Sequence, residues 1–358
     1  MADELLLLDN DDVAGVLDLD DCMIALEKAY RALAGGRLIE RARSQTRVPL
    51  AEPDVSYCFK SMEGALAGDG YMTLRITSDA VFEGKVDGRA RRDKLARGPG
   101  GTYCGLIFVF STVSLAPVAI IHDGLIQLAR VACTSALSVR LLAREDASVL
   151  GLIGTGQQAW WHLKAASTVR SLREARVYSP NAERRQAFAA RAKLELGIDV
   201  HAAATARAAV EGADIVIAAT NASEPVLDGR WLAPGTHVVS IVSGDKGSSR
   251  RELDDETLRR AALVVAHSRA GAIEHQNGDL AGPVAAGILS WEKIVDFPDL
   301  AAGNSPRRGG RDEITVFKNN GGTGLQFAAV APAVYERARE AGIGRKLPAA
   351  WFVENMPS

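Results

Sequence analysis

The sequence predicts an α/β protein, in which a Rossmann-like doubly wound sheet is joined to an N-terminal α+β domain. Short apolar runs alternate with amphipathic segments from residue 147 to about residue 270, which is typical of a parallel sheet with crossover helices. Period-2 patterns upstream of residue 123 indicate antiparallel strands instead. Residues 323–342 form a helical pattern outside the alternating series, and we expect this helix to complete the N-terminal domain.

Composition excludes several classes of function. The length of 358 residues suits two domains, and the net charge of −2 with a pI near 6.3 offers no footprint for nucleic acid. No apolar run approaches the roughly 20 residues that cross a bilayer, so no membrane contact is expected. The four cysteines lie far apart, without a CxxC pair or a metal-ligand spacing, which indicates reduced thiols in the cytoplasm and no metal site.

The first forty residues are predicted to hold a strand and a helix. The run of leucines at 5–8 indicates the strand, because no basic region of a signal peptide accompanies it. Asp18, Asp20 or Asp21 caps the helix, and Gly35-Gly36 ends it.

Strand pairs and a long helix follow. The alternating pattern over residues 41–77 turns at Gly68-Asp69-Gly70 and predicts paired strands. Residues 83–101 are polar, basic and glycine-rich, which indicates a loop, either a solvated excursion or a mobile lid. A second hairpin covers residues 105–123, and a long helix rich in small residues covers residues 125–144.

The alternating region begins with a glycine-rich turn. Residues 147–153 form an apolar run of strand length, and Gly154-Thr155-Gly156-Gln157-Gln158-Ala159 then gives a G-x-G-x-x-A pattern before a helix. In a dinucleotide site Gly154 makes the tight turn, Gly156 lets the backbone approach a pyrophosphate, and Ala159 lets the helix pack on its strand. The alternative is a glycine-rich turn without a ligand.

The end of the next strand indicates which dinucleotide is bound. An acid there bonds the adenosine ribose and favours NAD. Here the strand ends at Ser179-Pro180-Asn181, without a carboxylate, and Arg184 and Arg185 follow. Because Ser179 and Asn181 can donate hydrogen bonds and Arg184 can pair with a 2′-phosphate, we favour NADP over NAD. The alternative places both arginines on a solvated helix face.

Four segments together resemble the ornithine cyclodeaminase and μ-crystallin family. They are the residues Arg130-Val131-Ala132-Cys133-Thr134-Ser135-Ala136, the turn at 154–158, the segment Ser243-Gly244-Asp245 through Glu252-Leu253-Asp254, and Phe317-Lys318-Asn319-Asn320-Gly321. The resemblance covers about residues 3 to 342. It implies a substrate-binding and dimerisation domain over residues 1–128 and about 321–358, and an NAD(P)-binding Rossmann domain over residues 129–320.

The resemblance also implies roles for single residues. Asp245 matches the catalytic aspartate that exchanges a proton beside the substrate nitrogen, although a loop or helix-capping aspartate is the alternative. Arg130 matches an arginine that holds the substrate carboxylate or the cofactor. Arg47 matches a first-strand arginine that also grips the carboxylate, and Arg43 competes with it for that role. A surface position is the alternative for both.

One position departs from the family pattern. Where the family has a lysine that contacts the substrate, this chain has Arg75, which can bind a carboxylate but cannot readily shuttle a proton. Lys60, in the neighbouring strand, is our candidate for the missing amine, with a solvated or ion-paired lysine as the alternative. The linker from Asp123-Gly124 to Arg130 is also one residue shorter. Both changes argue against ornithine cyclodeamination itself.

The remaining site assignments complete the two binding regions. We assign Gly321 to the substrate site together with Arg47, Arg75 and Arg130. The cofactor site is assigned a larger set of residues: Thr102, Arg130, Gly154, Thr155, Gly156, Gln157, Gln158, Ser179, Asn181, Arg184, Thr220, Ser243, Asp245 and Asn320.

Three functions fit the resemblance. The favoured one is an NAD(P)-dependent oxidoreductase at a C–N bond, namely an imine or ketimine reductase or an amino-acid dehydrogenase, with Asp245 as proton donor. The second is an ornithine cyclodeaminase, a lyase that shows no net turnover of NAD(P)H. The third is a non-catalytic protein that binds NADP and a small ligand. The expected partners are a small amino or imino acid and a second copy of the chain, with the apolar strand at 105–112 in an intersubunit sheet.

Overall fold

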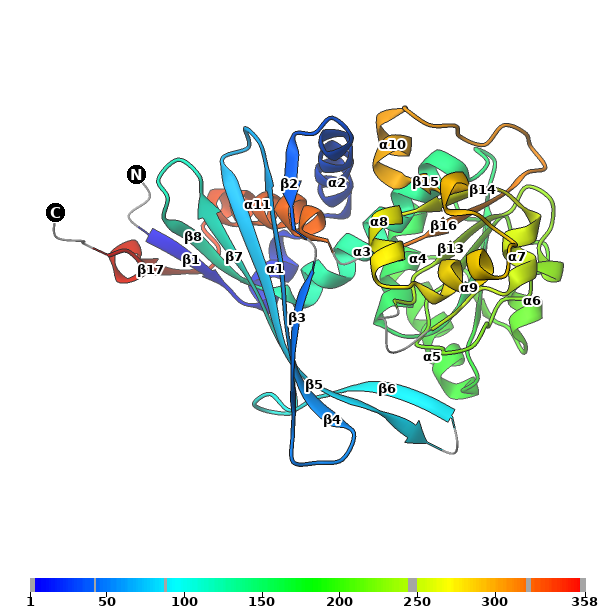
Figure 1. Ribbon diagram of the computed structural model, residues 1–358, viewed down its shortest axis with the longest axis horizontal. Coiled ribbons are helices and arrows are strands. Elements are labelled where there is room, and N and C mark those ends of the chain that lie inside the picture. Colours follow the sequence, from blue (N-terminus) through cyan, green and yellow to red (C-terminus); the bar gives the residue numbers. More distant parts are fainter. Residues whose placement is uncertain (1–3, 42, 87–88, 244–249, 320–322, 355–358) are drawn as a thin grey trace. The chain divides into compact units, whose positions relative to one another are not determined.

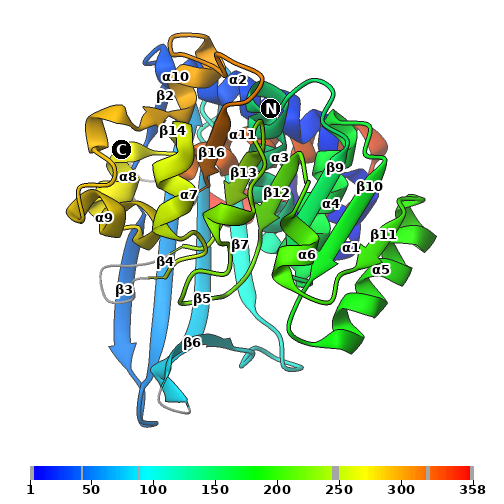
Figure 2. The ribbon, with the colours of Figure 1, turned by 90° about the vertical axis from the view of Figure 1, so that its right-hand side faces the viewer.

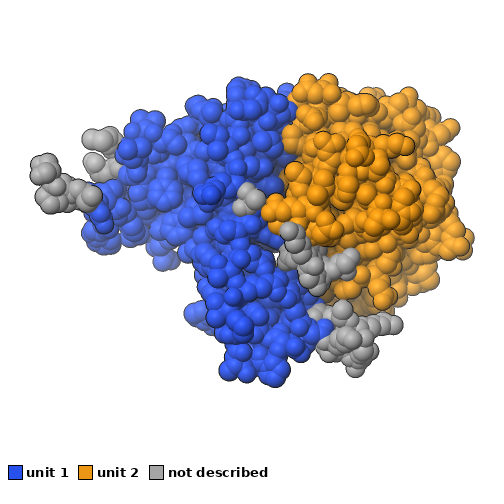
Figure 3. All heavy atoms as spheres, viewed as in Figure 1, with its two compact units in different colours: residues 1–130, 322–358 blue, residues 131–321 orange. Residues whose placement is uncertain are grey.

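The computed structural model describes residues 4–41, 43–86, 89–243, 250–319 and 323–354. Contacts between Cα atoms divide it into two units, of which unit 1 comprises residues 1–130 and 322–358 and unit 2 comprises residues 131–321 (Figure 3). The helix α3 (Asp123–Leu142) begins in unit 1 and ends in unit 2. By length and composition α3 is apolar enough to span a membrane, but 72% of its apolar window is buried inside the protein, as in a core helix.

Unit 1 is built on a mixed sheet of nine strands (Figure 1). Its main path runs β17-β1-β8-β7-β5-β4-β2, while β3 pairs with β4 and β6 pairs with β5. The strands are β1 (Glu4–Leu8), β2 (Leu38–Glu40), β3 (Ser44–Pro49), β4 (Val55–Leu66), β5 (Tyr71–Val86), β6 (Arg89–Leu95), β7 (Cys104–Ser111), β8 (Pro117–His122) and β17 (Arg345–Pro348). Among the described strands of this sheet, only β1 and β8 pair in parallel.

The helices of unit 1 begin and end where the sequence places their signals. The Asp9 side chain caps α1 (Asn10–Val16). The Asp18 side chain caps α2 (Leu19–Ala34), and Gly35 ends it, as predicted. The helix α11 (Gly324–Ala341) packs against α2 and β4. A Cβ at Gly324 would lie 1.8 Å from the Glu63 carbonyl oxygen, so only glycine lets this helix begin so close to the strand.

The prediction of a loop over residues 83–101 is wrong for residues 83–86 and 89–95, which are strands, and holds for residues 96–101. The strand β5 continues to Val86, and β6 pairs with it antiparallel. Opposite charges hold this pair, because the Arg92 guanidinium contacts the Glu83 carboxylate at 2.6 Å. Charged side chains hid the strand from a search for apolar alternation. The sequence signal that could have found it is Asp87-Gly88, a dipeptide typical of two-residue hairpins.

A second prediction for unit 1, that the strand at 105–112 belongs to an intersubunit sheet, stays a prediction for the sheet as a whole. The strand β7, expected in an intersubunit sheet, is paired with β5 on one side and with β8 on the other. Both of its hydrogen-bonding edges are therefore occupied within this chain, and β7 cannot extend a sheet into a partner.

Unit 2 is a parallel sheet of eight strands in the order β11-β10-β9-β12-β13-β16-β14-β15, flanked by helices (Figure 2). The strands are β9 (Val149–Ile153), β10 (Glu174–Tyr178), β11 (Val200–Ala202), β12 (Ile215–Ala218), β13 (His237–Ser240), β14 (Ala261–Ala266), β15 (Val295–Asp296) and β16 (Ile314–Lys318). The helices are α4 (Gln157–Val169), α5 (Ala182–Leu196), α6 (Ala206–Val210), α7 (Asp255–Arg260), α8 (Arg269–Glu274), α9 (Gly278–Ala285) and α10 (Phe297–Ala302).

The strand order of unit 2 identifies where a ligand binds. From β9 the chain winds to β10 and β11 on one side and then to β12 and β13 on the other. Open α/β sheets bind ligands at such a switch point, outside the carboxyl ends of the strands. That point lies between β9 and β12.

Candidate functional site

The glycine turn lies at this switch point, after the last residue of β9. Gly154 has φ +119, and a Cβ there would lie 2.2 Å from the Ala219 carbonyl oxygen. Gly156 is the N-cap of α4, provides no side-chain cap, and has no atom within 4 Å of where its Cβ would be. Ala159 is fully buried against the sheet. The first turn of α4 therefore begins beside open space without a cap, as a helix that binds a pyrophosphate requires.

Most of the polar side chains that follow β10 already form local hydrogen bonds. The Ser179 hydroxyl donates to the Asn181 carbonyl (3.1 Å), and the Asn181 side chain accepts from the Arg184 amide as the N-cap of α5. Arg185 donates to the Ser179 carbonyl and stacks over Tyr178. Among the described residues we find no hydrogen bond or ion pair for the exposed Arg184 guanidinium. Of the residues predicted to recognise a 2′-phosphate, Arg184 is thus the one whose charge remains available.

A second group of residues surrounds the carboxyl ends of β12, β13 and β16. The Thr220 amide and hydroxyl both donate to Glu252 Oε1, at 2.6 and 2.8 Å. Burial raises the pKa of Glu252, and the nearby Lys318 ammonium opposes that rise. Sequence reasoning placed Thr220 in the cofactor site but missed Glu252, although Glu252 lies in the segment that carries the family resemblance.

Asn319, next to the assigned Asn320, is a functional candidate that sequence reasoning missed. Its Nδ2 donates both protons, to the Val131 carbonyl and to the Ser135 hydroxyl (3.0 Å each). Its Oδ1 is buried and accepts no hydrogen bond from any described residue. A buried acceptor without a donor is costly, so it fits a ligand that brings an N–H or O–H group. The Gly156 space and this orphaned oxygen both fit a dinucleotide.

The Ser135 hydroxyl links Asn319 to α4. His162 Nε2 lies 3.0 Å from Ser135 Oγ, and His162 Nδ1 lies 2.7 Å from the Gln158 carbonyl. Since a carbonyl only accepts, Nδ1 carries the proton and Nε2 accepts from Ser135. Burial lowers the pKa of His162 to about 4, so its imidazole is neutral at pH 7.

In unit 1 the structure brings three of the candidate side chains onto one face of the sheet. Lys60 on β4 and Arg75 on β5 point to the same face and are buried. Arg75 donates to the Asp123 carboxylate through Nε (3.0 Å) and Nη2 (2.5 Å). Arg130, also buried, donates to the side chain of Gln326. The Phe327 ring lies 5.2 Å from the Arg75 guanidinium carbon and 5.1 Å from that of Arg130.

The electrostatics of this face favour an anion. Burial lowers the pKa of Arg130 to about 10, and the positive charges of Arg75 and Arg43 add to the effect, while Asp123 opposes it. A guanidinium so close to other cations in a buried position is stabilised by a carboxylate, which it binds through a bidentate pair of hydrogen bonds.

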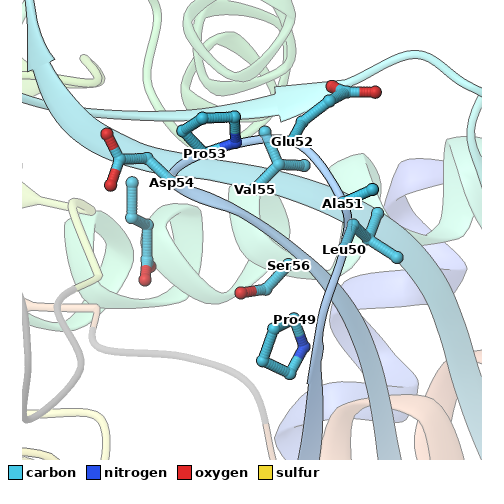
Figure 4. A pocket seen from close by; sticks show the side chains of 9 residues that line it. Pro49, Leu50, Ala51, Glu52, Pro53, Asp54, Val55 and Ser56 are labelled. Carbon is cyan, nitrogen blue, oxygen red and sulfur yellow. The ribbon is translucent and has the colours of Figure 1, made fainter.

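The structure places Arg47 on this face of the sheet but farther along the strands than Arg75. Its guanidinium is bonded to the Glu83 carboxylate, which lines a shallow hollow at the turn between β3 and β4 (Figure 4). In register, Arg47 lies level with Asp79, four residues along β5 from Arg75. The competing residue, Arg43, is the one whose charge acts on Arg130. The assignment of the substrate carboxylate to Arg47 or to Arg43 stays a prediction.

The other assigned residues divide into two groups. Thr102 is exposed in the turn after β6, where its hydroxyl donates to the Pro99 carbonyl, and Ser243 is exposed after β13. Asp245, Asn320 and Gly321 lie outside the residues that the structure describes.

The chain is similar to known proteins over most of its length. Residues 4–342 match the model of the ornithine cyclodeaminase/mu-crystallin family. A putative dehydrogenase of Rhizobium meliloti is 30% identical over 94% of this chain and 97% of its own length. A delta(1)-pyrroline-2-carboxylate reductase of Paracoccus denitrificans is 36% identical over 63% of this chain and 71% of its own. The structure of the Thermococcus litoralis delta(1)-pyrroline-2-carboxylate reductase with NADH and L-proline has a TM-score of 0.82 at 26% identity, covering 96% of this chain and 100% of that one.

Proposed function

Since the chain belongs to the ornithine cyclodeaminase/mu-crystallin family, we propose that it is an NAD(P)-dependent oxidoreductase that reduces the C–N double bond of a small imino acid. The observation that carries the proposal is the buried pair of Arg75 and Arg130 over the Phe327 ring in unit 1, which suits a substrate carboxylate. Two of the similar proteins are reductases of delta(1)-pyrroline-2-carboxylate, a cyclic imino acid. The nicotinamide, when bound, supplies the hydride.

The residues of unit 1 orient the substrate. Arg130 and Arg75 grip its carboxylate, with Arg43 beside them. Asp123 and Phe327 hold the Arg75 guanidinium in place. Fixing the carboxylate at two or more donors restricts the substrate to one orientation, and orientation of this kind contributes to the rate.

A proton must reach the substrate nitrogen when the carbon accepts hydride. We assign that proton to Asp245, following the family resemblance, with the buried Lys60 as the amine nearest to the family lysine that Arg75 replaces. Arg75 cannot serve, because a guanidinium paired with Asp123 stays charged at neutral pH.

The decisive experiment follows NADPH absorbance with delta(1)-pyrroline-2-carboxylate and with small 2-oxo acids plus ammonia or methylamine. Net NADPH consumption with at least one of them is expected, whereas a cyclodeaminase acting on ornithine shows none. Asp245→Asn is expected to lower kcat about 100-fold or more, because general acid catalysis contributes roughly 10²–10⁴-fold. Asp199→Asn, at an exposed position of unit 2, is the control and leaves kcat unchanged. Unchanged turnover in Asp245→Asn contradicts the assigned proton donor.

We propose NADP as the preferred cofactor. The support is the absence of a carboxylate after β10 and the available charge of Arg184. Arg184→Gln is expected to weaken NADPH binding about tenfold while NADH binding changes little, because only NADPH carries the 2′-phosphate. Lys193→Gln, exposed on the same helix, controls for the loss of one positive charge. A wild-type protein that binds NADH more tightly than NADPH overturns the assignment.

The cellular setting follows from the same proposal. A small amino or imino acid and a second copy of this chain are the partners we propose. The thiols of Cys22, Cys58, Cys104 and Cys133 are free, which suits the reducing cytoplasm.

A further inference from the structure

Lys318 makes a complete set of hydrogen bonds inside unit 2. It is the last residue of β16, and none of its surface is exposed. Its ammonium donates to the Asp279 carboxylate (2.6 Å), to the Ser240 hydroxyl (2.9 Å) and to the Val242 carbonyl (2.6 Å). An ammonium has three protons, and all three are used. Lys318 therefore has no proton left for a substrate or cofactor, so its role is to hold other groups in place.

The two carboxylates around it are just as fully used. Asp279 Oδ1 accepts from the amides of Glu252 and Leu253, at 2.8 and 2.9 Å, and Asp279 Oδ2 accepts from Lys318. Glu252 Oε2 accepts from the amides of Ile241 and Val242, at 2.8 Å each, and Glu252 Oε1 accepts from the amide and hydroxyl of Thr220. The single proton of the Ser240 hydroxyl lies between Asp279 Oδ2 (2.7 Å) and Glu252 Oε2 (2.8 Å), so both oxygens of each carboxylate have donors. The network is thus satisfied by the protein alone.

Such a network is expensive to build. Removing an ion pair from water costs several kcal/mol per ion, and apolar residues of similar volume often stabilise a fold as well or better. The core of the same sheet is otherwise filled by apolar side chains such as Val216, Val238 and Val316. A stability gain does not account for charges at this one position. A requirement for exact placement of the backbone accounts for these buried charges.

The backbone that this network holds lies directly before the proposed cofactor and proton-transfer residues in the sequence. In register Ala218, Ser240 and Lys318 lie side by side at the carboxyl ends of β12, β13 and β16. Beyond Ser240 the sheet pairing of β13 stops, and the amides of Ile241 and Val242 are held by the Glu252 side chain instead of by a strand. Ser243 follows directly, and Asp245 two residues later in the sequence. After β12, Thr220 donates hydrogen bonds to Glu252 of the same network. After β16, Asn319 is the residue that follows Lys318.

We infer that Lys318, with Asp279 and Glu252, is a positioning residue of the reductase: its buried network sets the course of the chain beyond β12, β13 and β16, and so the placement of Thr220, Asn319 and Ser243. This inference rests on the proposed function for the part that concerns turnover. Its effect on cofactor binding is independent of the substrate.

The test compares this network with a matched one at the opposite edge of the sheet. Lys318→Met combined with Asp279→Asn removes both charges without leaving either one unpaired. Arg144→Met combined with Asp214→Asn does the same at the amino ends of β9 and β12, where Asp214 accepts from the amides of Ser148 and Val149. For each variant we measure the midpoint of urea unfolding, the Kd for NADPH, and kcat and KM for imine reduction.

The expected result separates placement from stability. Both double variants unfold at lower urea concentration. Only the Lys318/Asp279 variant raises the NADPH Kd about tenfold and lowers kcat about 100-fold with KM changed less than fivefold, because small misplacements at a reacting site cost on the order of 10² in rate. If its Kd and kcat stay within threefold of wild type, the network is structural only and the inference is wrong.

The experiment still tests the inference if the double variant does not fold or if the wild-type protein is inactive. If the Lys318/Asp279 variant does not fold, Glu252→Gln replaces it, since this near-isosteric change keeps the Lys318–Asp279 pair and removes acceptors for Thr220 or Val242; the same loss of NADPH affinity and kcat, at least fivefold, is expected. If wild-type protein reduces none of the imines, the proposed function fails, and the NADPH Kd of the variants against the Arg144/Asp214 control still supports or overturns the positioning role.

Discussion

In unit 2, carboxylates bind backbone amides at both ends of the strands, here called the amino edge and the carboxyl edge of the sheet, but their surroundings differ. At the amino edge the Asp214 carboxylate accepts from the amides of Ser148 and Val149 and pairs with Arg144. At the carboxyl edge the Glu252 carboxylate accepts from the amides of Ile241 and Val242 beside the Lys318–Asp279 pair. The side chains of Arg144 and Asp214 are 18% and 16% exposed, while those of Lys318 and Asp279 are 0% exposed.

This difference in burial corresponds to two different roles. The pair at the amino ends connects neighbouring strands, whereas the pair at the carboxyl ends fixes the position of the proposed site residues. A partly exposed ion pair can adjust its geometry with the help of water, and it contributes little to stability. A fully buried pair allows one arrangement only, because any shift leaves a buried charge without its partner. The fully buried pair lies at the carboxyl edge, together with the glycine turn, Thr220 and Asn319. The partly exposed pair lies at the amino edge, which carries none of the proposed site residues.

The largest effect is expected from Gly154→Ala, at the carboxyl end of β9. Alanine is strained at φ +119, and its Cβ would meet the Ala219 carbonyl oxygen at 2.2 Å, so β9 and β12 would have to separate. We expect a loss of about 3 kcal/mol or more in the free energy of unfolding, measured by urea denaturation, and no measurable NADPH binding. Gly197→Ala, which has φ +66 but open space for a Cβ, is the control and is expected to cost about 1 kcal/mol. Equal losses in the two variants would show that the contact with Ala219 is unimportant.

Two buried histidines extend the comparison to acid stability. His237 begins β13 at the amino edge and contacts Thr315 and Ser138, while His162 lies on α4. Burial lowers the pKa of His162 to about 4 and that of His237 to about 3, both from 6.5. Because the unfolded chain binds these protons first, the stability that the neutral imidazoles contribute is fully present above pH 6.5 and is lost as the pH falls toward 4 and 3.

For His162 this loss amounts to about 3 kcal/mol at pH 4. His162→Gln and His237→Gln are each expected to flatten the fall in unfolding free energy between pH 6.5 and pH 4, measured by urea titration at each pH. Only His162→Gln should also weaken NADPH binding a few-fold, since it alone contacts the Gln158 carbonyl. His201→Gln, at a mostly exposed site, is the control and leaves the slope unchanged. An unchanged slope in both buried variants would contradict the proposed burial effect.

A smaller effect is expected from Gly156→Ala, two residues after Gly154. The position has φ −82 and no atom near the place of a Cβ, so the fold accommodates alanine. The methyl group would stand where the backbone is proposed to approach the pyrophosphate. We expect an unfolding midpoint close to that of wild type and an NADPH Kd raised about tenfold, which corresponds to about 1.4 kcal/mol. Unchanged affinity would place the phosphates elsewhere.

The smallest effect is expected from Asp146→Asn at the amino edge. Arg144 and Arg311 hold the pKa of Asp146 down to about 2 from 3.8. The stability that these pairs contribute is present above pH 3.8 and is lost as the pH falls through about 2. Since Asp146 is exposed, we expect a change in Tm of at most about 2 °C at pH 7, smaller still in 1 M salt, and unchanged kcat. A drop in kcat would refute the contrast between the two edges.

Much of this fold was predictable from local signals. The apolar runs of unit 2 are the strands of a parallel sheet, and capping residues such as Asp18 and Asn181 begin their helices. The hairpin of β5 and β6 was not predictable from alternation, because cross-strand charges such as Glu83 and Arg92 stabilise it. Pairs of this kind become visible only when the register is known.

The candidate site shows the same division. The sequence by itself determined the family, the glycine turn and the class of cofactor, because these depend on residues close together in the chain. Only the tertiary structure decided that Arg75 and Arg130 contact the same Phe327 ring, that Asn319 carries the open acceptor, and that Lys318 meets Asp279 and Glu252. Each of these results depends on contacts between residues far apart in the chain, 39 positions for Lys318 and Asp279 and 188 for Asn319 and Val131, and neither spacing nor composition carries that information.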